Sequence, residues 1–199
     1  MILKDDSLSP AERREYLETA SRHGERLTKL VFDLFELAKL DAHELKPERE
    51  PFPLTELIQD VTQKFQLRAQ QAKVNLAIDD APDIPFVDAD IGMIERVLDN
   101  LIDNALQHTP AGGSIHLSLE LRDSEITVKI KDTGEGLSAE AIPHIFDRFY
   151  RKSATASNAN GAGLGLAISQ RIIELHGGEI SVSSILNKGA EFNFSLPAH

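Results

Sequence analysis

The sequence lacks cysteine altogether and contains no run of about 18 consecutive apolar residues, the length that a membrane-spanning helix needs. The absence of cysteine excludes disulfide bonds and thiolate metal sites. The absence of a long apolar run predicts that no part of this chain crosses a bilayer. Residues 1–6 show no basic stretch followed by an apolar core, so we expect no secretory signal here.

Basic residues are scarce relative to acidic ones. The chain has 21 Lys and Arg against 32 Asp and Glu, which gives a formal net charge of -11 at pH 7. Binding to nucleic acid needs basic surface that displaces counterions from phosphates. We therefore expect no nucleic-acid partner, and an anionic ligand has to be held by local geometry.

Apolar residues make up 41% of the 199 residues, enough for one domain of about 150 residues and a smaller piece. The smaller piece starts with Ser9, Pro10 and Glu12, which match a capping box at the start of a helix. From residue 16 to residue 40, apolar side chains recur at helical spacing. Such a stripe needs a helical partner, in the same chain or in a second copy.

Residues 1–4 are too short to be that partner, so we expect this chain to begin near the end of a first hairpin helix. Further along, Pro47, Pro51 and Pro53 lie in a charged stretch from residue 41 to residue 53. Prolines at this density end a helix and predict a linker. We therefore divide the chain into a helical piece, residues 1–47, and a second domain, residues 48–199.

The second domain alternates between two periodicities. We expect helices at 54–73, 91–107 and 164–176, and strands at 74–79, 86–87, 114–121, 125–131, 179–185 and 191–196. The polar stretch 151–161 is expected to be a mobile loop. This order predicts an α+β fold, with one layer of helices over a mixed, largely antiparallel sheet.

Three short segments carry most of the functional information. They are Asn-Leu-Ile-Asp-Asn-Ala at 100–105, Asp-Thr-Gly-Glu-Gly at 132–136 and Gly-Ala-Gly-Leu-Gly at 161–165. The first places two amides four residues apart on one helix face, the second a carboxylate beside a glycine turn, and the third three glycines before a helix. Taken singly, each also fits a structural amide pair, a polar turn or a flexible loop. Together they are typical of an ATP site.

Each segment suits a particular contact with a nucleotide. The amide oxygen of Asn100 or Asn104 suits Mg2+, which prefers oxygen ligands and takes others from water and phosphates. Asp132 can accept a hydrogen bond from the exocyclic amine of adenine, whereas guanine would oppose it with a carbonyl. The glycine segment can line a phosphate site at the positive end of a helix. It lacks the preceding strand of a dinucleotide-binding fold and the following Lys-Ser or Lys-Thr of a P-loop.

With His108-Thr-Pro and the segment 146–151, Phe-Asp-Arg-Phe-Tyr-Arg, these segments resemble the N, G1, F and G2 boxes of sensor histidine kinases in order and spacing. Residues 8–40 are similar to the second helix of the dimerisation and phosphoacceptor hairpin of that family. The resemblance therefore covers nearly the whole chain. It implies a two-layer α/β sandwich of the Bergerat (GHKL) type after a bundle helix. It also implies transfer of the γ-phosphoryl group of Mg-ATP to a histidine.

The resemblance also implies roles for single residues. Asn104 would bind Mg2+ with Asn100 in support, Asp132 would read adenine, and the two amides with His108 are the candidate catalytic residues. Phe149 and Tyr150 would anchor the loop. The full set of candidate nucleotide-binding residues is Asn100, Asn104, His108, Asp132, Gly134, Gly136, Phe149, Tyr150, Arg151, Gly161, Gly163, Leu164, Gly165 and Leu166.

Several positions depart from the family pattern. Gln107 stands where many relatives carry a lysine near the phosphates, so that contact would come from His108 or Arg151. The last glycine box, Asn-Lys-Gly-Ala at 187–190, keeps one of the usual two glycines, and we assign it no role.

The acceptor histidine, expected on the first hairpin helix, is missing from this chain. His43-Glu-Leu-Lys-Pro imitates the acceptor segment, but it follows the second helix and its proline comes one residue early. We interpret it as a decoy, and His23 as a surface or bundle histidine.

Two other functions remain open. Related ATPases of the gyrase and Hsp90 type carry a glutamate that activates water where this chain has Asn100, and an amide has no basic lone pair for that task. Phosphoryl transfer is therefore favoured over hydrolysis, with a GHKL-type ATPase or a regulatory nucleotide-binding module as alternatives. The resemblance implies a receiver domain of a response regulator as partner, a homodimer through the first helix, and a cytoplasmic location, as part of a membrane-anchored sensor.

Overall fold

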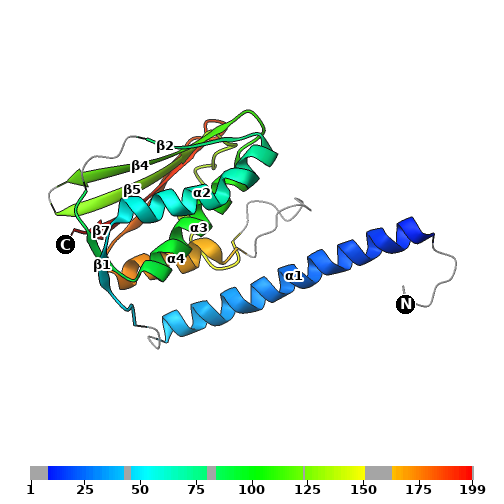
Figure 1. Cartoon of the computed structure of the whole chain (residues 1–199), viewed down its shortest axis with the longest axis horizontal. Coiled ribbons are helices and arrows are strands. Elements are labelled where there is room, and N and C mark those ends of the chain that lie inside the picture. The colour runs from blue at the N-terminus through cyan, green and yellow to red at the C-terminus, as the bar shows by residue number, and fades with distance from the viewer. Residues whose placement is uncertain (1–8, 43–45, 80–83, 123, 151–162, 199) are drawn as a thin grey trace.

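The computed structural model describes residues 9–42, 46–79, 84–122, 124–150 and 163–198. It begins with a long helix, α1 (Pro10–Asp41), that extends away from a sandwich of helices and strands (Figure 1). The Ser9 hydroxyl accepts from the amide of Glu12, and the Glu12 carboxylate accepts from the amide of Ser9. The predicted capping box at the start of this helix is confirmed.

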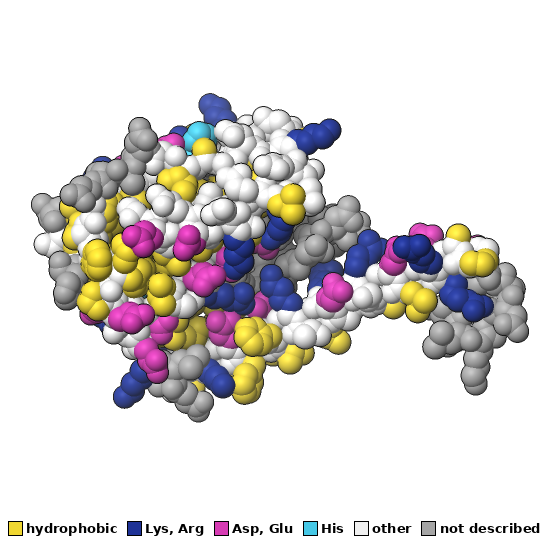
Figure 2. All heavy atoms as spheres, viewed as in Figure 1, with side chains coloured by type: hydrophobic (Ala, Val, Ile, Leu, Met, Phe, Trp, Pro, Cys, Tyr) yellow, Lys and Arg dark blue, Asp and Glu magenta, His cyan; other side chains and the backbone are white. Residues whose placement is uncertain are grey.

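The C-terminal part of α1, from Lys29 onward, contacts the sandwich. Asp33, Leu37 and Leu40 share one helix face and are buried, and α1 packs mainly against α4 (Gly165–Leu175). Figure 2 shows hydrophobic side chains along the part of α1 that points away from the sandwich. The helix face opposite Asp33, Leu37 and Leu40 carries exposed apolar residues, namely Tyr16, Leu17, Leu27, Val31, Leu34 and Phe35.

The sheet has the strand order β2-β4-β5-β7-β6. Its strands are β2 (Asn75–Ile78), β4 (Ser114–Arg122), β5 (Glu125–Asp132), β6 (Ile180–Ser184) and β7 (Ala190–Pro197). The pair β2 and β4 is parallel and the other pairs are antiparallel, so the predicted mixed, largely antiparallel sheet is confirmed. Alternate residues of β4 and β5 are buried, which matches their apolar and polar alternation.

Helices α2 (Leu54–Ala72), α3 (Ile91–His108) and α4 cover one face of this sheet (Figure 1). The core between the layers is apolar, with Leu101 and Ile102 of α3 and Phe192 and Phe194 of β7 almost fully buried. A short 3-10 helix, η2 (Ile142–His144), follows the turn after β5. The predicted α+β fold, a two-layer sandwich preceded by a long helix, is confirmed.

The expected linker contains a strand that sequence reasoning missed. Strand β1 (Glu50–Phe52) pairs antiparallel with β3 (Val87–Ala89) in a separate two-stranded sheet. The expected domain boundary, between residues 47 and 48, lies between α1 and β1 and stays a prediction. Within the described ranges, no helix is both long and apolar enough to span a membrane.

Candidate functional site

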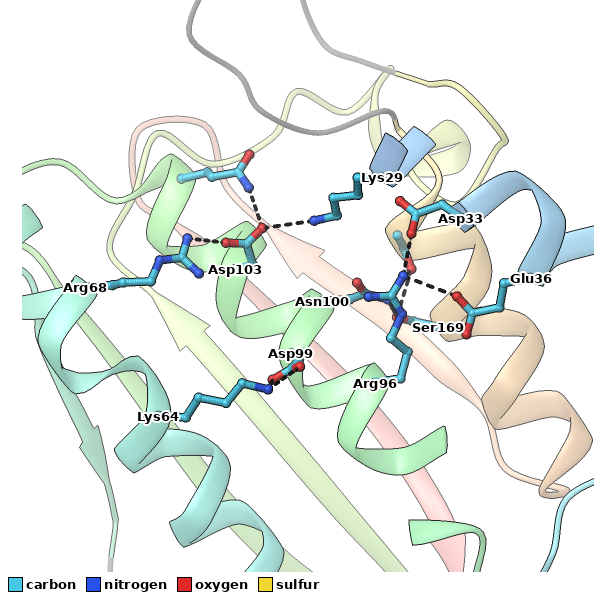
Figure 3. A network of polar contacts seen from close by, with 12 residues as sticks. Lys29, Asp33, Glu36, Lys64, Arg68, Arg96, Asp99, Asn100, Asp103 and Ser169 are labelled. Atoms are coloured by element: carbon cyan, nitrogen blue, oxygen red, sulfur yellow. Dashed lines mark hydrogen bonds and ion pairs between the residues drawn. The ribbon is translucent and has the colours of Figure 1, made fainter. Parts of the chain in front are cut away.

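Helix α3 presents the two candidate amides on its partly buried side. Its apolar residues, including Val97, Leu101 and Ala105, pack into the core, and Asn100 and Asn104 lie at the edge of that face. The amide nitrogen of Asn100 donates to the backbone oxygen of Gly165 at 3.0 Å and to the hydroxyl of Ser169 at 3.2 Å. Asn100 therefore joins α3 to the first turn of α4 (Figure 3).

The carboxylates beside these amides are turned toward α2 (Figure 3). Asp99 pairs with the Lys64 ammonium at 2.7 Å, and Asp103 pairs with the Arg68 guanidinium at 2.5 Å. Asp99 and Asp103, which lie next to the two amides in the sequence, are thus both engaged in ion pairs with α2.

Asp132, the last residue of β5, is 4% exposed. Its Oδ1 accepts from the amide of Gly134 at 2.7 Å and from the amide of Ala190 at 3.2 Å. Burial raises the pKa of this carboxyl, and the two amide donors partly offset that effect. Because both of these hydrogen bonds end on Oδ1, Oδ2 is the oxygen left for a ligand.

Two glycines allow close backbone approach around Asp132. A Cβ on Gly134 would lie 2.3 Å from the backbone oxygen of His108, and a Cβ on Gly189 would lie 1.9 Å from that of Asp132. Gly189 also has a φ of +91°, a conformation that L side chains rarely adopt. Gly134 and Gly136 are both buried, and Gly189 belongs to the same cluster although the sequence suggested no role for it.

A pocket of about 520 Å³ opens beside Asp132. It is lined by Gln107, His108, Thr109, Pro110, Thr133, Gly134, Glu135 and Asn187. At its edge, the Nδ1 of His108 lies 2.9 Å from a carboxylate oxygen of Glu135, and Gln107 donates to Asp103 at 2.7 Å. The pocket unites His108 with the glycine turn, but Asn100 and Asn104 lie outside its lining.

The last glycine of the glycine segment, Gly165, is the first residue of α4. Leu164 is fully buried, whereas Gly165 and Leu166 are partly buried. The amide of Phe149 donates to the backbone oxygen of Gly163 at 2.9 Å. Phe149 is 55% exposed, so this contact with Gly163 is made by its backbone.

Two candidates and one expected element lie outside the described residues. Arg151 and Gly161 are the candidates, and the stretch 151–161 is the element expected to be a mobile loop. His43 of the decoy segment also lies outside them. Tyr150 is described and partly buried, with its ring centroid 5.9 Å from that of His144.

The described part of the chain contains no group of three or more His, Cys, Asp or Glu side chains that could hold a metal ion. The amides of α3 carry oxygens of the kind that Mg2+ accepts as ligands, together with phosphates and water. The orientation of Asn100 fits this, because its nitrogen is used for α4 and its oxygen is not.

Comparisons with known proteins identify histidine kinases and related ATPases as similar to this chain. The profile of the histidine kinase-, DNA gyrase B-, and HSP90-like ATPase family matches residues 89–199. The sensor histidine kinase RppB of Synechocystis is 34% identical over 197 residues, which cover 98% of this chain and 43% of RppB. The chain thus spans less than half the length of this relative.

Solved structures of histidine kinases are similar to this chain as well. Full-length ShkA, in complex with AMPPNP, matches 98% of this chain and 41% of its own with a TM-score of 0.82 and 29% identity. The histidine kinase ThkA, in complex with the response regulator protein TrrA, matches 98% of this chain and 54% of its own with a TM-score of 0.79 and 25% identity. The chain belongs to the histidine kinase-, DNA gyrase B- and HSP90-like ATPase family, and it corresponds to the ATP-binding catalytic portion of a sensor histidine kinase with the helix that precedes it.

Proposed function

We propose that this chain holds Mg-ATP and transfers its γ-phosphoryl group to a histidine that lies outside the chain. The observation that carries the proposal is the environment of Asn100. An amide occupies the crossing of α3 and α4, and the neighbouring carboxylates Asp99 and Asp103 are ion-paired with α2. Among these residues none is placed to take a proton from water, which favours transfer to a separate nucleophile over hydrolysis.

Residues around the pocket would bind and orient the nucleotide. Oδ2 of Asp132 would accept from the exocyclic amine of adenine. Gly134 and Gly136 would let the backbone approach the base, and His108, held by Glu135, would line the base or the phosphates. Residues Gly163, Leu164, Gly165 and Leu166, together with Phe149, Tyr150, Arg151 and Gly161, would border the phosphate end.

Mg2+ would be held by the amide oxygens of Asn104 and Asn100. When bound, it would neutralise charge that develops on the phosphates. The chain's own part is to fix these oxygens on a rigid helix. The N-terminus of α4 adds a positive dipole near the phosphates.

Partners and location follow from the same proposal. The complex of ThkA with a response regulator supports a receiver domain as partner of this chain. The exposed apolar face of α1, with Leu27, Val31 and Leu34, supports pairing with a bundle helix and with a second copy. A cytoplasmic location fits a protein that uses ATP.

The reaction is tested with labelled ATP. The chain alone is expected to acquire no acid-labile phosphate, and to phosphorylate a separately supplied helical hairpin that carries an acceptor histidine. Steady hydrolysis without that hairpin would instead identify an ATPase. Binding without either reaction would identify a regulatory module.

Binding assays test the site. Mg-ATP is expected to bind more tightly than Mg-GTP, and Asp132→Asn is expected to reduce that preference. Asn104→Ala should weaken binding in the presence of Mg2+ and leave binding in EDTA nearly unchanged. Equal affinity for both nucleotides would contradict the role of Asp132.

A further inference from the structure

Ser169 is fully buried in α4 and has no part in the reaction described above. Its hydroxyl donates to the backbone oxygen of Gly165 at 2.9 Å and accepts from the amide nitrogen of Asn100 at 3.2 Å. The same amide nitrogen donates to the Gly165 oxygen at 3.0 Å. Three groups from two helices thus form a closed triangle of hydrogen bonds. Figure 3 shows Asn100 of α3 beside Ser169 of α4.

This triangle determines which end of the Asn100 amide faces α4. The carbonyl of Gly165 can only accept, and Ser169 spends its single hydroxyl hydrogen on that carbonyl. Toward Asn100 both groups therefore present lone pairs. Turning the amide over would bring its oxygen against two acceptors and lose two hydrogen bonds.

The amide oxygen consequently points away from these two acceptors. A Cβ built on Gly165 would lie 3.3 Å from this oxygen, so the oxygen lies beside the first residue of α4. This is the end of α4 that the glycine segment leads into. The opposite orientation would present NH2 donors there, and an NH2 group cannot ligate a cation.

We propose that Ser169 is a positioning residue that fixes the orientation of the Asn100 amide and so presents its oxygen to the cation of Mg-ATP. The proposal rests on the proposed function for the identity of the ligand. The orientation itself rests on the three hydrogen bonds. A purely structural Ser169 would stabilise α4 through Gly165 without affecting the dependence of nucleotide binding on Mg2+.

The test compares Ser169→Ala with the unaltered chain in two measurements. The first is hydrogen exchange of the Asn100 side-chain amide by NMR without nucleotide, which should become faster when the hydroxyl is removed. The second is the Kd for ATP with Mg2+ and with EDTA. Loss of one neutral hydrogen bond predicts about fivefold weaker binding with Mg2+ and little change in EDTA.

The Asn100→Ala background separates positioning from general destabilisation. If Ser169 acts through Asn100, adding Ser169→Ala to Asn100→Ala should change the Kd for Mg-ATP by less than about twofold. Ser195→Ala is the matched control. It removes another buried serine hydroxyl, which accepts from the amide of Glu179 instead, and it should leave the exchange of Asn100 unchanged.

Equal weakening with Mg2+ and with EDTA, or the same weakening in the Asn100→Ala background, would overturn the proposal. So would unchanged exchange of the Asn100 amide in Ser169→Ala. If that variant does not fold, fast exchange of this amide in the unaltered chain would overturn it as well. If the unaltered chain binds no ATP, the proposed function fails, and the exchange measurement still decides whether Ser169 orients Asn100.

Discussion

The contact between α1 and the sandwich is built differently from the core between helices and sheet. The core joins apolar side chains such as Leu101, Ile102 and Phe192, all almost fully buried. The α1 contact buries only Leu37 and Leu40 as large apolar residues and surrounds them with charges.

Those charges form ion pairs across the α1 contact (Figure 3). Arg96 of α3 pairs with Asp33 at 2.5 Å and with Glu36 at 3.2 Å, and Arg148 pairs with Asp41 at 2.6 Å. Burial raises the pKa of Glu36, and Arg96 partly offsets this. Close apolar packing in the core contributes much stability and is lost when the packed layers shift slightly. Ion pairs such as those at α1 fix the orientation of the helix but gain little net free energy. The difference predicts that the α1 contact contributes less to stability than the core between helices and sheet.

The largest effect is expected in the core. Phe192→Ala should lower the free energy of unfolding of the whole sandwich by about 3–5 kcal/mol, because it leaves a cavity between the layers. Denaturant unfolding followed by circular dichroism measures this. Phe86→Ala, at a phenylalanine that is 50% exposed, is the control and should cost much less. Similar losses in both would contradict the assignment of the core.

A smaller effect is expected at the α1 contact. Asp33→Ala leaves the Arg96 charge partly buried without its main partner, which should weaken the contact by about 1–3 kcal/mol. Hydrogen exchange is expected to accelerate in the last turns of α1 and to stay unchanged in the sheet. Equal acceleration in the sheet would show that α1 and the sandwich unfold as one unit.

The third effect depends on pH and arises at His176. This buried side chain accepts from the amide of Asp90 through Nε2, and its Nδ1 lies 2.8 Å from the backbone oxygen of Ile172. Burial lowers its pKa below the usual 6.5, so the unfolded chain binds the proton more readily. This contribution to stability is complete above pH 6.5 and is lost as the pH falls below it.

For one proton, the slope that His176 contributes is at most about 1.4 kcal/mol per pH unit. Unfolding free energies measured between pH 7.5 and 5 check it, with His176→Gln as the comparison, whose slope should be shallower. Equal slopes in both proteins would mean that other groups control the acid sensitivity.

The smallest effect is expected at the surface pair of Lys64 with Asp99, where the lysine side chain is 53% exposed. Lys64→Ala should cost no more than about 1 kcal/mol of unfolding free energy, because water and salt screen such pairs. It is also the matched control for Asp33→Ala, since both break an ion pair of α3. A larger loss for Lys64→Ala than for Asp33→Ala would contradict the expectation that the partly buried pair at α1 matters more than the exposed pair at α2.

Periodicity predicted most of the elements, because long amphipathic patterns have few alternatives. Helix α3 was expected at 91–107 and spans Ile91–His108. Strand β1 was missed because Pro51 and Pro53 indicate a linker, yet prolines are compatible with a short edge strand.

The contacts of the site were less predictable. The bond from Asn100 to Ser169 joins residues 69 positions apart, and the role of Gly189 depends on its packing against Asp132. Neither follows from local pattern, because both require the folded arrangement of two distant segments. The motifs predicted the candidate residues, and the fold determined what these residues contact.

The hydrogen bond from Phe149 to the backbone oxygen of Gly163 ties together two points of the chain that are 14 residues apart. A Cβ on Gly163 would lie 2.8 Å from the backbone oxygen of Tyr150, and the φ of Gly163 is +72°. Any larger residue at position 163 would therefore push these two points of the chain apart and strain its own backbone. The requirement for glycine at this position thus follows from the backbone connection alone, whatever ligand the neighbouring site holds.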